Sequence, residues 1–474
     1  MSPSPPYPDH FLWGVSTAGH QVEGGLNGLG EPRNNWAAWE DAGRVARTGR
    51  GVRFWERWAD DLDLARALGV NAFRMGLEWA RIEPARDTRD RAALDRYADI
   101  IAGARRRGLE PVVTLQHFTH PEWLGPDPWL DPAVPRRFAA HCATTARELG
   151  ERLAARGEGP VRFWVTVNEP NTLCLATSYL RVFPRGRGRG GARDLSAALA
   201  GILEAHVRAR RALRDGYLAA GWPEPTVTYN AWASAVYATD RYLIDLLRPE
   251  TRGHTRDLRR ELRRALGRVG PIGRVADWAL TRAVKPAAFA PLVAELGKDE
   301  DALDVLAFDY YHPFVGDYLG WRGPKKHPWQ WPAEAHRMPD FTAAWIGPHR
   351  DRRLHILEHG IGTRPRPHRG HHRPDRLDRG RAIGDALAAV DECLARGLDV
   401  ASYFHWSLVD NYEWGSFEPR FGLHAIDHDD DARRLPHDAT GVDAASAYRA
   451  AIAERRARAA VDRRIGDDDG TATR

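Results

Sequence analysis

Short apolar runs rich in β-branched and aromatic residues recur along the whole chain, each followed by a longer stretch of mixed polarity. Runs of this kind predict buried β-strands, and strands that alternate with helical stretches are typical of a parallel sheet. Because there are eight runs, we expect the α/β class and a single (β/α)8 barrel, or TIM barrel, over residues 1–464. The runs are Phe11 to Gly19, Val70 to Met75, Pro111 to Gln116, Val161 to Val167, Thr226 to Trp232, Val305 to Tyr310, Arg353 to Leu357 and Val400 to Trp406.

The intervening stretches predict helices and, in three places, elaborated βα loops. Trp55 to Leu68 has apolar residues at helical spacing. Val182 to Asp194 is rich in Gly and Arg, Asp240 to Leu303 is a long basic helical insertion, and Ile361 to Arg381 is rich in Pro, His and Arg. All three follow strand ends, so we expect them to shape the entrance to a site. The polar, acidic residues 465–474 predict a disordered tail.

Carboxylates stand at the carboxyl ends of the fourth and seventh apolar runs. The fourth run continues into Asn168 and Glu169, and the seventh continues into Glu358 and His359. Barrels of this kind place their active sites at that face. A carboxylate on the rim of an apolar barrel is costly to desolvate unless it is paired or functional. Two that converge on one cleft from opposite sides therefore predict acid/base chemistry.

These two segments resemble the Asn-Glu-Pro and Glu-Asn-Gly signatures of glycoside hydrolase family 1. Four further segments resemble the first, second, third and eighth strands of that family, in the same order along the chain. The resemblance thus covers nearly the whole barrel. The segments are Phe11 to Ala18 with Gln21 to Gly24, Phe73 to Ile82, Thr114 to Phe118, and Trp406 to Trp414.

The resemblance implies a retaining β-glycosidase that works by double displacement, with Glu358 as nucleophile and Glu169 as acid/base. In such enzymes the two carboxyl groups stand roughly 5 to 5.5 Å apart. The charge of Glu358 and a hydrophobic wall are expected to raise the pKa of Glu169 and keep it protonated for the first step. Esterification of Glu358 removes that charge, so Glu169 can then act as a base toward water.

The resemblance also implies supporting roles. Arg74 would pair with the nucleophile, although an ion pair that only compensates for burial is an alternative. Tyr311 would donate a hydrogen bond to Glu358, the alternative being an ordinary buried tyrosine. Asn168 would hold the sugar 2-hydroxyl. The glycon, which is the sugar that is transferred, would be bound by Gln21, His117, Trp406, Glu413 and Trp414.

Two positions depart from the family pattern. The usual asparagine of the sixth strand is Asp309 here, and His359 replaces the asparagine that follows the nucleophile. A carboxylate beside Glu358 would raise the pKa of that nucleophile. We place Asp309 with Arg74 among the residues that orient Glu358. Our hypothesis is that Asp309 pairs with Arg74, His312 or His359, or is turned away.

The eighth-strand segment indicates a substrate with a neutral glycon. Family members that act on 6-phosphorylated sugars replace the Glu413-Trp414 pair, whereas here Glu413 and Glu418 would repel a phosphate and only Arg420 could offset them. We expect a small β-glycoside or oligosaccharide, whether glucoside, galactoside or fucoside. A transglycosylase with the same intermediate is equally compatible. A catalytically inactive sugar-binding barrel is disfavoured because both glutamates are present.

The composition argues against several other classes of protein. Lys and Arg total 69 against 64 Asp and Glu, and the basic stretches Arg252 to Arg268 and Arg364 to Arg381 lack interleaved aromatic residues, so no nucleic-acid partner is expected. No segment approaches the roughly 18 apolar residues of a membrane helix, and residues 1–10 lack a signal-peptide pattern. An odd number of scattered cysteines favours a reducing, cytoplasmic compartment. They are Cys142, Cys174 and Cys393.

A cluster of histidines raises the question of a metal. His359, His368, His371 and His372 stand close together in the chain, but their spacing among Pro, Arg and Gly matches no regular ligand motif. Double displacement requires neither a metal nor a cofactor, so we expect none and favour a solvated loop. Nothing in the sequence indicates an oligomeric state.

Overall fold

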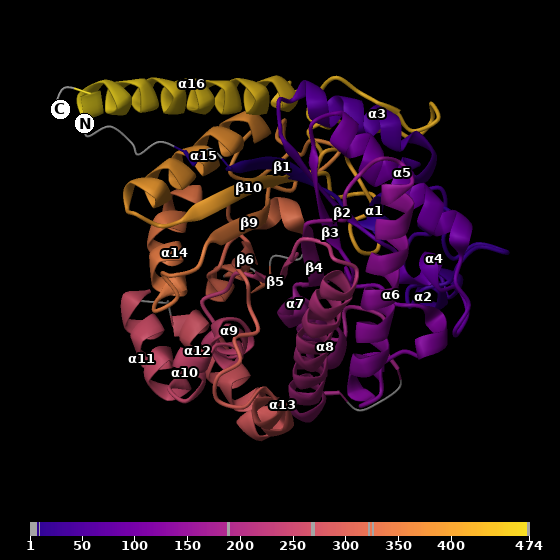
Figure 1. Ribbon diagram of the computed structural model, residues 1–474. Coiled ribbons are helices and arrows are strands. Elements are labelled where there is room, and N and C mark those ends of the chain that lie inside the picture. The colour runs from indigo at the N-terminus through magenta and orange to yellow at the C-terminus, as the bar shows by residue number, and fades with distance from the viewer. Residues whose placement is uncertain are drawn as a thin grey trace.

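Eight parallel strands close into a barrel in the order β1-β10-β9-β6-β5-β4-β3-β2 (Figure 1). The computed structural model describes residues 7–8, 10–186, 190–266, 271–320, 323–324 and 327–471. The predicted (β/α)8 barrel is confirmed, and each predicted run overlaps one strand. The strands are β1 (Leu12–Ser16), β2 (Ala72–Gly76), β3 (Glu110–Thr114), β4 (Phe163–Asn168), β5 (Thr226–Trp232), β6 (Leu306–Asp309), β9 (Leu354–His359) and β10 (Val400–Trp406).

Helices surround the barrel (Figure 1). The longer ones are α3 (Phe54–Ala67), α5 (Arg91–Arg106), α6 (Val134–Ala154), α8 (Ala192–Ala219), α14 (Met338–Ile346), α15 (Arg379–Ala395) and α16 (Ala444–Thr471). Short helices and two-residue strands occupy the loops. They are α1 (Gly19–Val22), α2 (Ala37–Asp41), α4 (Trp79–Ile82), α7 (Pro170–Cys174), β7 (Leu319–Gly320), β8 (Gly323–Pro324), β11 (Ile426–Asp427) and β12 (Arg433–Arg434).

Helix α5 shows why these helices form where they do. The Asp90 side chain accepts a hydrogen bond from the Ala93 backbone N–H at 2.9 Å and so caps the first turn. Leu94, Tyr97 and Ile101 follow at three- and four-residue spacing and are fully buried. One apolar face therefore packs against the barrel, and the opposite face remains polar.

The barrel interior is apolar at its base and polar at its carboxyl end. Side chains two residues apart on a strand point to the same side. Ala72 belongs to the small interior cluster and Arg74 follows it on the same side of β2, while Ala307 and Asp309 are related in the same way on β6. Polar groups thus lie above a closed apolar base, which directs them into one site. The interior cluster comprises Ala72, Val112, Phe163, Val165, Ala307, Leu357 and Phe404.

The predicted insertion between the fifth and sixth barrel strands is helical. It contains α9 (Arg241–Leu247), α10 (Pro249–Arg252), α11 (Thr255–Ala265), α12 (Pro271–Ala283) and α13 (Ala290–Leu296). Residues 187–189 of the Gly/Arg loop lie outside the described residues.

The carboxyl-terminal helix α16 packs along α15 on the outside of the barrel (Figure 1). It reaches Thr471 and so enters the 465–474 segment, whose last residues, 472–474, lie outside the described part. The disordered tail stays a prediction.

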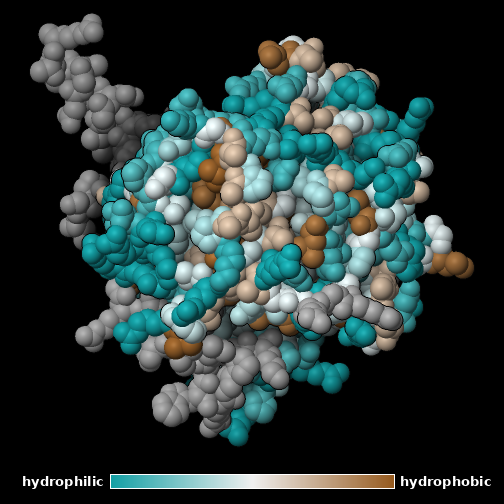
Figure 2. Space-filling model, turned by 90° about the horizontal axis from the view of Figure 1, so that it is seen from below, coloured by the Kyte–Doolittle hydropathy of each residue, from teal (hydrophilic) through white to brown (hydrophobic). Residues whose placement is uncertain are grey.

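On the face drawn in Figure 2, hydrophilic side chains predominate and apolar ones are scattered among them. None of the described helices combines the length and apolarity that crossing a bilayer requires. The cysteines Cys142, Cys174 and Cys393 are buried and form no disulfide; the cytoplasmic location stays a prediction.

Candidate active site

Glu358 is held on both carboxylate oxygens at the carboxyl end of β9. Arg74 on β2 donates from Nη1 to Glu358 Oε1, and Tyr311 donates from its hydroxyl to Oε2 at 2.9 Å. Burial raises the pKa of Glu358, while the positive charge of Arg74 and then the Tyr311 hydrogen bond oppose that rise. The two donors fix the carboxylate in one orientation and favour its ionised form.

Arg74 also connects Glu358 to two asparagines. Its Nη2 donates to Asn168 Oδ1 at 2.5 Å, and its Nε donates to Thr114 Oγ1 at 3.2 Å. Asn230 Nδ2 donates to the same Asn168 oxygen at 2.8 Å. Asn230 was not among the residues predicted from the sequence, although it is a polar residue near the end of the fifth run. Its register pairing with Asn168 across β4 and β5 places the two side by side.

Glu169 begins helix α7 in a left-handed conformation, with φ 40° and ψ 62°. Strain of this kind in a non-glycine residue is maintained only where the surrounding structure fixes it. Here the Glu169 N–H donates to Asn230 O at 2.8 Å. Carboxylate oxygens of Glu169 and Glu358 lie within 4.8 Å of each other. Burial, followed by the negative charge of Glu358, raises the pKa of Glu169 to about 8.

Asp309 is directed into the site, which differs from the hypothesis that it pairs with a cation or turns away. Its Oδ2 accepts a hydrogen bond from Asn230, and one of its oxygens lies within 4.8 Å of a Glu169 oxygen. His359 instead contacts the Tyr403 hydroxyl through Nδ1 at 2.9 Å. Successive residues on a strand point to opposite sides, which explains why His359 lies in the core next to a catalytic candidate.

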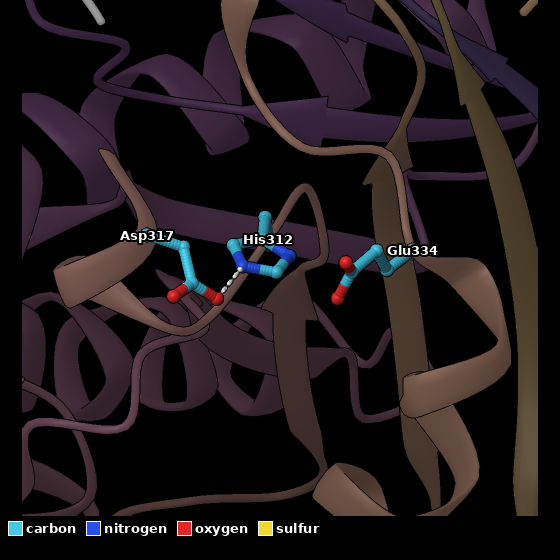
Figure 3. A group of neighbouring side chains, drawn as sticks. All are labelled: His312, Asp317 and Glu334. Atoms are coloured by element: carbon cyan, nitrogen blue, oxygen red, sulfur yellow. Dashed lines mark hydrogen bonds and ion pairs between the residues drawn. The ribbon is translucent and has the colours of Figure 1, made fainter. Parts of the chain in front are cut away.

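His312, the other proposed partner of Asp309, belongs to a separate cluster. Its ring lies between the carboxylates of Asp317 and Glu334, and Nε2 contacts Asp317 Oδ2 at 2.8 Å (Figure 3). Arg337 pairs with Asp317 at 3.4 Å and with Glu334 at 3.0 Å. The Arg337 guanidinium therefore offsets one of these two negative charges. The carboxylates lie on opposite sides of the imidazole (Figure 3), which is unfavourable for binding one cation through one ring nitrogen.

The residues predicted to bind the glycon form a wall of aromatic rings and polar groups beside the carboxylates. Trp406 Nε1 donates to Glu413 Oε1 at 3.1 Å. The His117 ring is stacked between Trp406 and Trp414, with centroid distances of 5.9 Å and 5.7 Å. Burial raises the pKa of Glu413 to about 8. The structure thus brings together the predicted residues from both ends of the chain.

Several polar atoms of this wall are buried and have no hydrogen-bond partner among the described residues. Gln21 donates from Nε2 to Asn411 at 3.1 Å, but its Oε1 is unpartnered. His117 Nδ1 and Asn168 Nδ2 are also unpartnered. Buried polar atoms are normally satisfied. Donors and acceptors left over in one place suit a polyhydroxylated ligand, whose hydroxyls can serve as both.

A family model and curated relatives agree with this arrangement. The model "Glycosyl hydrolase family 1" matches residues 4–252 and 325–442. Coniferin β-glucosidase of Pinus contorta is 26% identical over 91% of this chain and 90% of its own length. The bifunctional β-D-glucosidase/β-D-fucosidase of Bifidobacterium breve is also 26% identical, over 90% of this chain and 95% of its own.

Solved structures show the same fold. The family 1 β-glucosidase of Thermotoga maritima superimposes with a TM-score of 0.72 at 20% identity, covering 96% of this chain and 99% of its own. The AHE enzyme of Alicyclobacillus herbarius superimposes with a TM-score of 0.70 at 20% identity, covering 95% and 99%.

The stretch between the two matched segments, 253–324, contains most of the helical insertion and all of β6. Asp309 and Tyr311 therefore lie outside the matched residues, and their place in the site comes from the barrel geometry. The two matched segments, one on each side of this stretch, together cover well over half of the chain. The chain belongs to glycosyl hydrolase family 1 and is a glycoside hydrolase.

Proposed function

We propose that this enzyme is a retaining β-glycosidase with Glu358 as nucleophile and Glu169 as acid/base. The observation that carries the proposal is the asymmetry of the two carboxyl groups. Glu358 accepts hydrogen bonds from Arg74 and Tyr311, which favour its ionised form. Glu169, with an oxygen within 4.8 Å, has a raised pKa that keeps it protonated at neutral pH. Two carboxyl groups this close suit retention, since inversion needs room for a water between them.

In the first step a Glu358 oxygen attacks the anomeric carbon, and the bond to the departing oxygen breaks. That oxygen keeps the bonding electron pair and takes the proton of Glu169. The negative charge moves from Glu358 to Glu169, so the total charge of the site does not change. Asn168, held by Arg74 and Asn230, leaves Nδ2 free to bind the 2-hydroxyl of the sugar.

In the second step water attacks the anomeric carbon of the glycosyl ester. Glu169, now a carboxylate, takes a proton from the water, and Glu358 leaves with the electrons of the ester bond. Because esterified Glu358 carries no charge, it no longer raises the pKa of Glu169. Glu169 is still basic enough to take the proton from water. The cycle returns both groups to their starting protonation.

We infer that the glycon is neutral, with β-glucosides as the leading class and galactosides and fucosides as alternatives. The relatives include a coniferin β-glucosidase and a bifunctional β-D-glucosidase/β-D-fucosidase. The buried carboxyl of Glu413 and the free Oε1 of Gln21 offer a hydrogen-bond donor and acceptors that suit hydroxyl groups. Transfer of the sugar to an acceptor other than water would use the same intermediate, and product analysis distinguishes the two outcomes.

The test is a panel of p-nitrophenyl β-glucoside, β-galactoside and β-fucoside with the wild type, Glu358→Ala and a control. Glu454→Ala, an exposed glutamate on α16, is the matched control. We expect turnover by the wild type and the control, and a loss of at least about a thousandfold in kcat for Glu358→Ala. No turnover of any glycoside, or equal turnover by Glu358→Ala, contradicts the proposal.

A further inference from the structure

Three buried carboxyl groups meet in the active site, where the basic mechanism uses two. Oxygens of Glu169, Asp309 and Glu358 lie within 4.8 Å of one another, and Asp309 is fully buried. Among the described residues, Arg74 is the cation that forms an ion pair with this group, through Glu358. One positive charge cannot balance three carboxylates in a buried site. At least one carboxyl group besides the acid/base must therefore carry a proton if the site is to be neutral.

The hydrogen bonds identify the group that carries it. Glu358 receives donors on both oxygens, which favours its anion. Asp309 receives one donor, from Asn230 to Oδ2, and its buried Oδ1 has no donor among the described residues. Tyr311 cannot supply that donor because it is bonded to Glu358. An ionised Asp309 would place a second buried negative charge beside Glu358, with Arg74 offsetting both, and this arrangement costs free energy.

We propose that Asp309 is a positioning residue that keeps a proton throughout the reaction and donates it as a hydrogen bond to the acid/base Glu169. This inference rests on the proposed function, because it takes Glu169 as the acid/base. The charged and titratable groups that face Asp309 are Glu358, Glu169, Arg74 and Tyr311. Burial and then the charges of the two glutamates raise the pKa of Asp309 well above its usual range, against the opposing effect of Arg74.

The proton balance of the reaction is unchanged by this residue. Glu169 gives its own proton to the departing oxygen and recovers one from water, while the Asp309 O–H bond never breaks. What changes is the strength of the hydrogen bond, because a bond to a carboxylate is stronger than one to a carboxylic acid. Asp309 thus stabilises the Glu169 anion that forms in the first step and orients it for the second.

The first test counts protonated carboxyl groups by infrared spectroscopy and needs no substrate. We expect Asp309→Asn to lose one buried carboxylic-acid carbonyl band at neutral pH, and the exposed control Asp385→Asn on α15 to lose none. Glu169→Gln should retain the Asp309 band at a shifted frequency, which gives a second measurement if Asp309→Asn folds poorly. An unchanged spectrum for Asp309→Asn together with no Asp309 band in Glu169→Gln overturns the proposal.

The second test is the pH profile of kcat/KM. An asparagine donates to Glu169 as protonated Asp309 does, so Asp309→Asn should keep the alkaline limb in place. Asp309→Leu lacks the donor, so its alkaline limb should move to higher pH by about one unit. If Asp309 were ionised, Asp309→Asn would remove a negative charge and move both limbs to lower pH. If Asp309→Asn loses the carboxylic-acid band but the wild type cleaves no glycoside, the proposed function is wrong, while the assignment of a proton to Asp309 still holds.

Discussion

Asp309 and Glu358 occupy paired register positions on the adjacent parallel strands β6 and β9. Neighbouring strands lie about 4.8 Å apart, so this register places two carboxyl groups side by side. Arg74 reaches Glu358 from β2, elsewhere in the barrel, and offsets the repulsion. Glu358 therefore depends on its ion pair with Arg74 to stay ionised.

Arg74→Lys should shift the acidic limb of the kcat/KM profile to higher pH. Glu358 must be ionised to attack. The Arg74 guanidinium bonds Glu358, Asn168 and Thr114 at once, and a lysine replaces it with a single point charge. Weaker stabilisation of the anion raises the pKa of Glu358, so activity is lost at a higher pH as the solution is acidified. We expect kcat/KM to fall by about 10- to 100-fold, as for loss of a hydrogen bond to a charged group.

The matched control for Arg74 is Arg81→Lys. Arg81 forms a buried ion pair with Glu23 at 2.9 Å outside the catalytic pair. Lysine keeps the positive charge but loses the planar guanidinium that bonds its partners, so both variants should lower the free energy of unfolding in a denaturant titration. Only Arg74→Lys should move the acidic limb. An unchanged limb in Arg74→Lys would show that Arg74 serves stability alone.

The alkaline limb of kcat/KM should lie near pH 8. Glu169 must be protonated to assist the departing oxygen, and its pKa is raised to about 8 by burial and by the charge of Glu358. Activity is therefore present below that pH and is lost as pH rises through it. Glu169→Gln, assayed with an activated aryl glycoside that needs little acid assistance, should show no alkaline limb. If the alkaline limb persists in Glu169→Gln, that limb belongs to the titration of another group.

Glu413→Gln should weaken binding of the glycon. The buried Glu413 carboxyl is positioned by Trp406 at 3.1 Å, within the wall that contains Gln21 and His117. Because burial keeps Glu413 mainly protonated at neutral pH, we expect kcat/KM for a β-glucoside to fall by about two- to tenfold, as for the loss of a neutral hydrogen bond. The loss should shrink with the deoxy-glucoside that lacks the bound hydroxyl, and Glu454→Gln should show none. An equal loss with every deoxy-glucoside would argue for a general structural effect.

Activity should survive dialysis against EDTA. The proposed chemistry uses two carboxyl groups, one guanidinium and water, and Arg74 and Arg337 already provide cations at the two groups of carboxylates. We expect kcat to be unchanged within error after chelation, measured with the glycoside that the panel identifies. Loss of activity in EDTA that zinc restores would assign a role to a metal.

Much of the fold and the two central glutamates could be predicted from the chain. The eight runs overlap the eight barrel strands because a buried parallel strand must be apolar whatever surrounds it. The α3 helix lies at Phe54–Ala67, within one residue of the prediction at each end. Glu169 and Glu358 stand out because a carboxylate after an apolar strand is costly unless it functions.

The contacts of Asp309 were not predictable in the same way. The sequence places a carboxylate at the end of β6, and the hypothesis of a cationic partner was reasonable by charge alone. The structure instead has Asn230 and Glu169 around it. Asn230 itself was overlooked because a lone asparagine in a strand has no meaning until its neighbours across the sheet are known.

The sequence by itself determined which residues are apolar, where strands and helices form and which glutamates stand at the ends of the fourth and seventh barrel strands, because these depend on local patterns and on segment order. Tertiary structure alone decided which polar groups meet. Strand register sets Asp309 beside Glu358 and Asn168 beside Asn230, and barrel closure brings Arg74 to Glu358. Charges and hydrogen bonds act over a few ångströms, so their partners, and the pKa values they set, exist only once the barrel has closed.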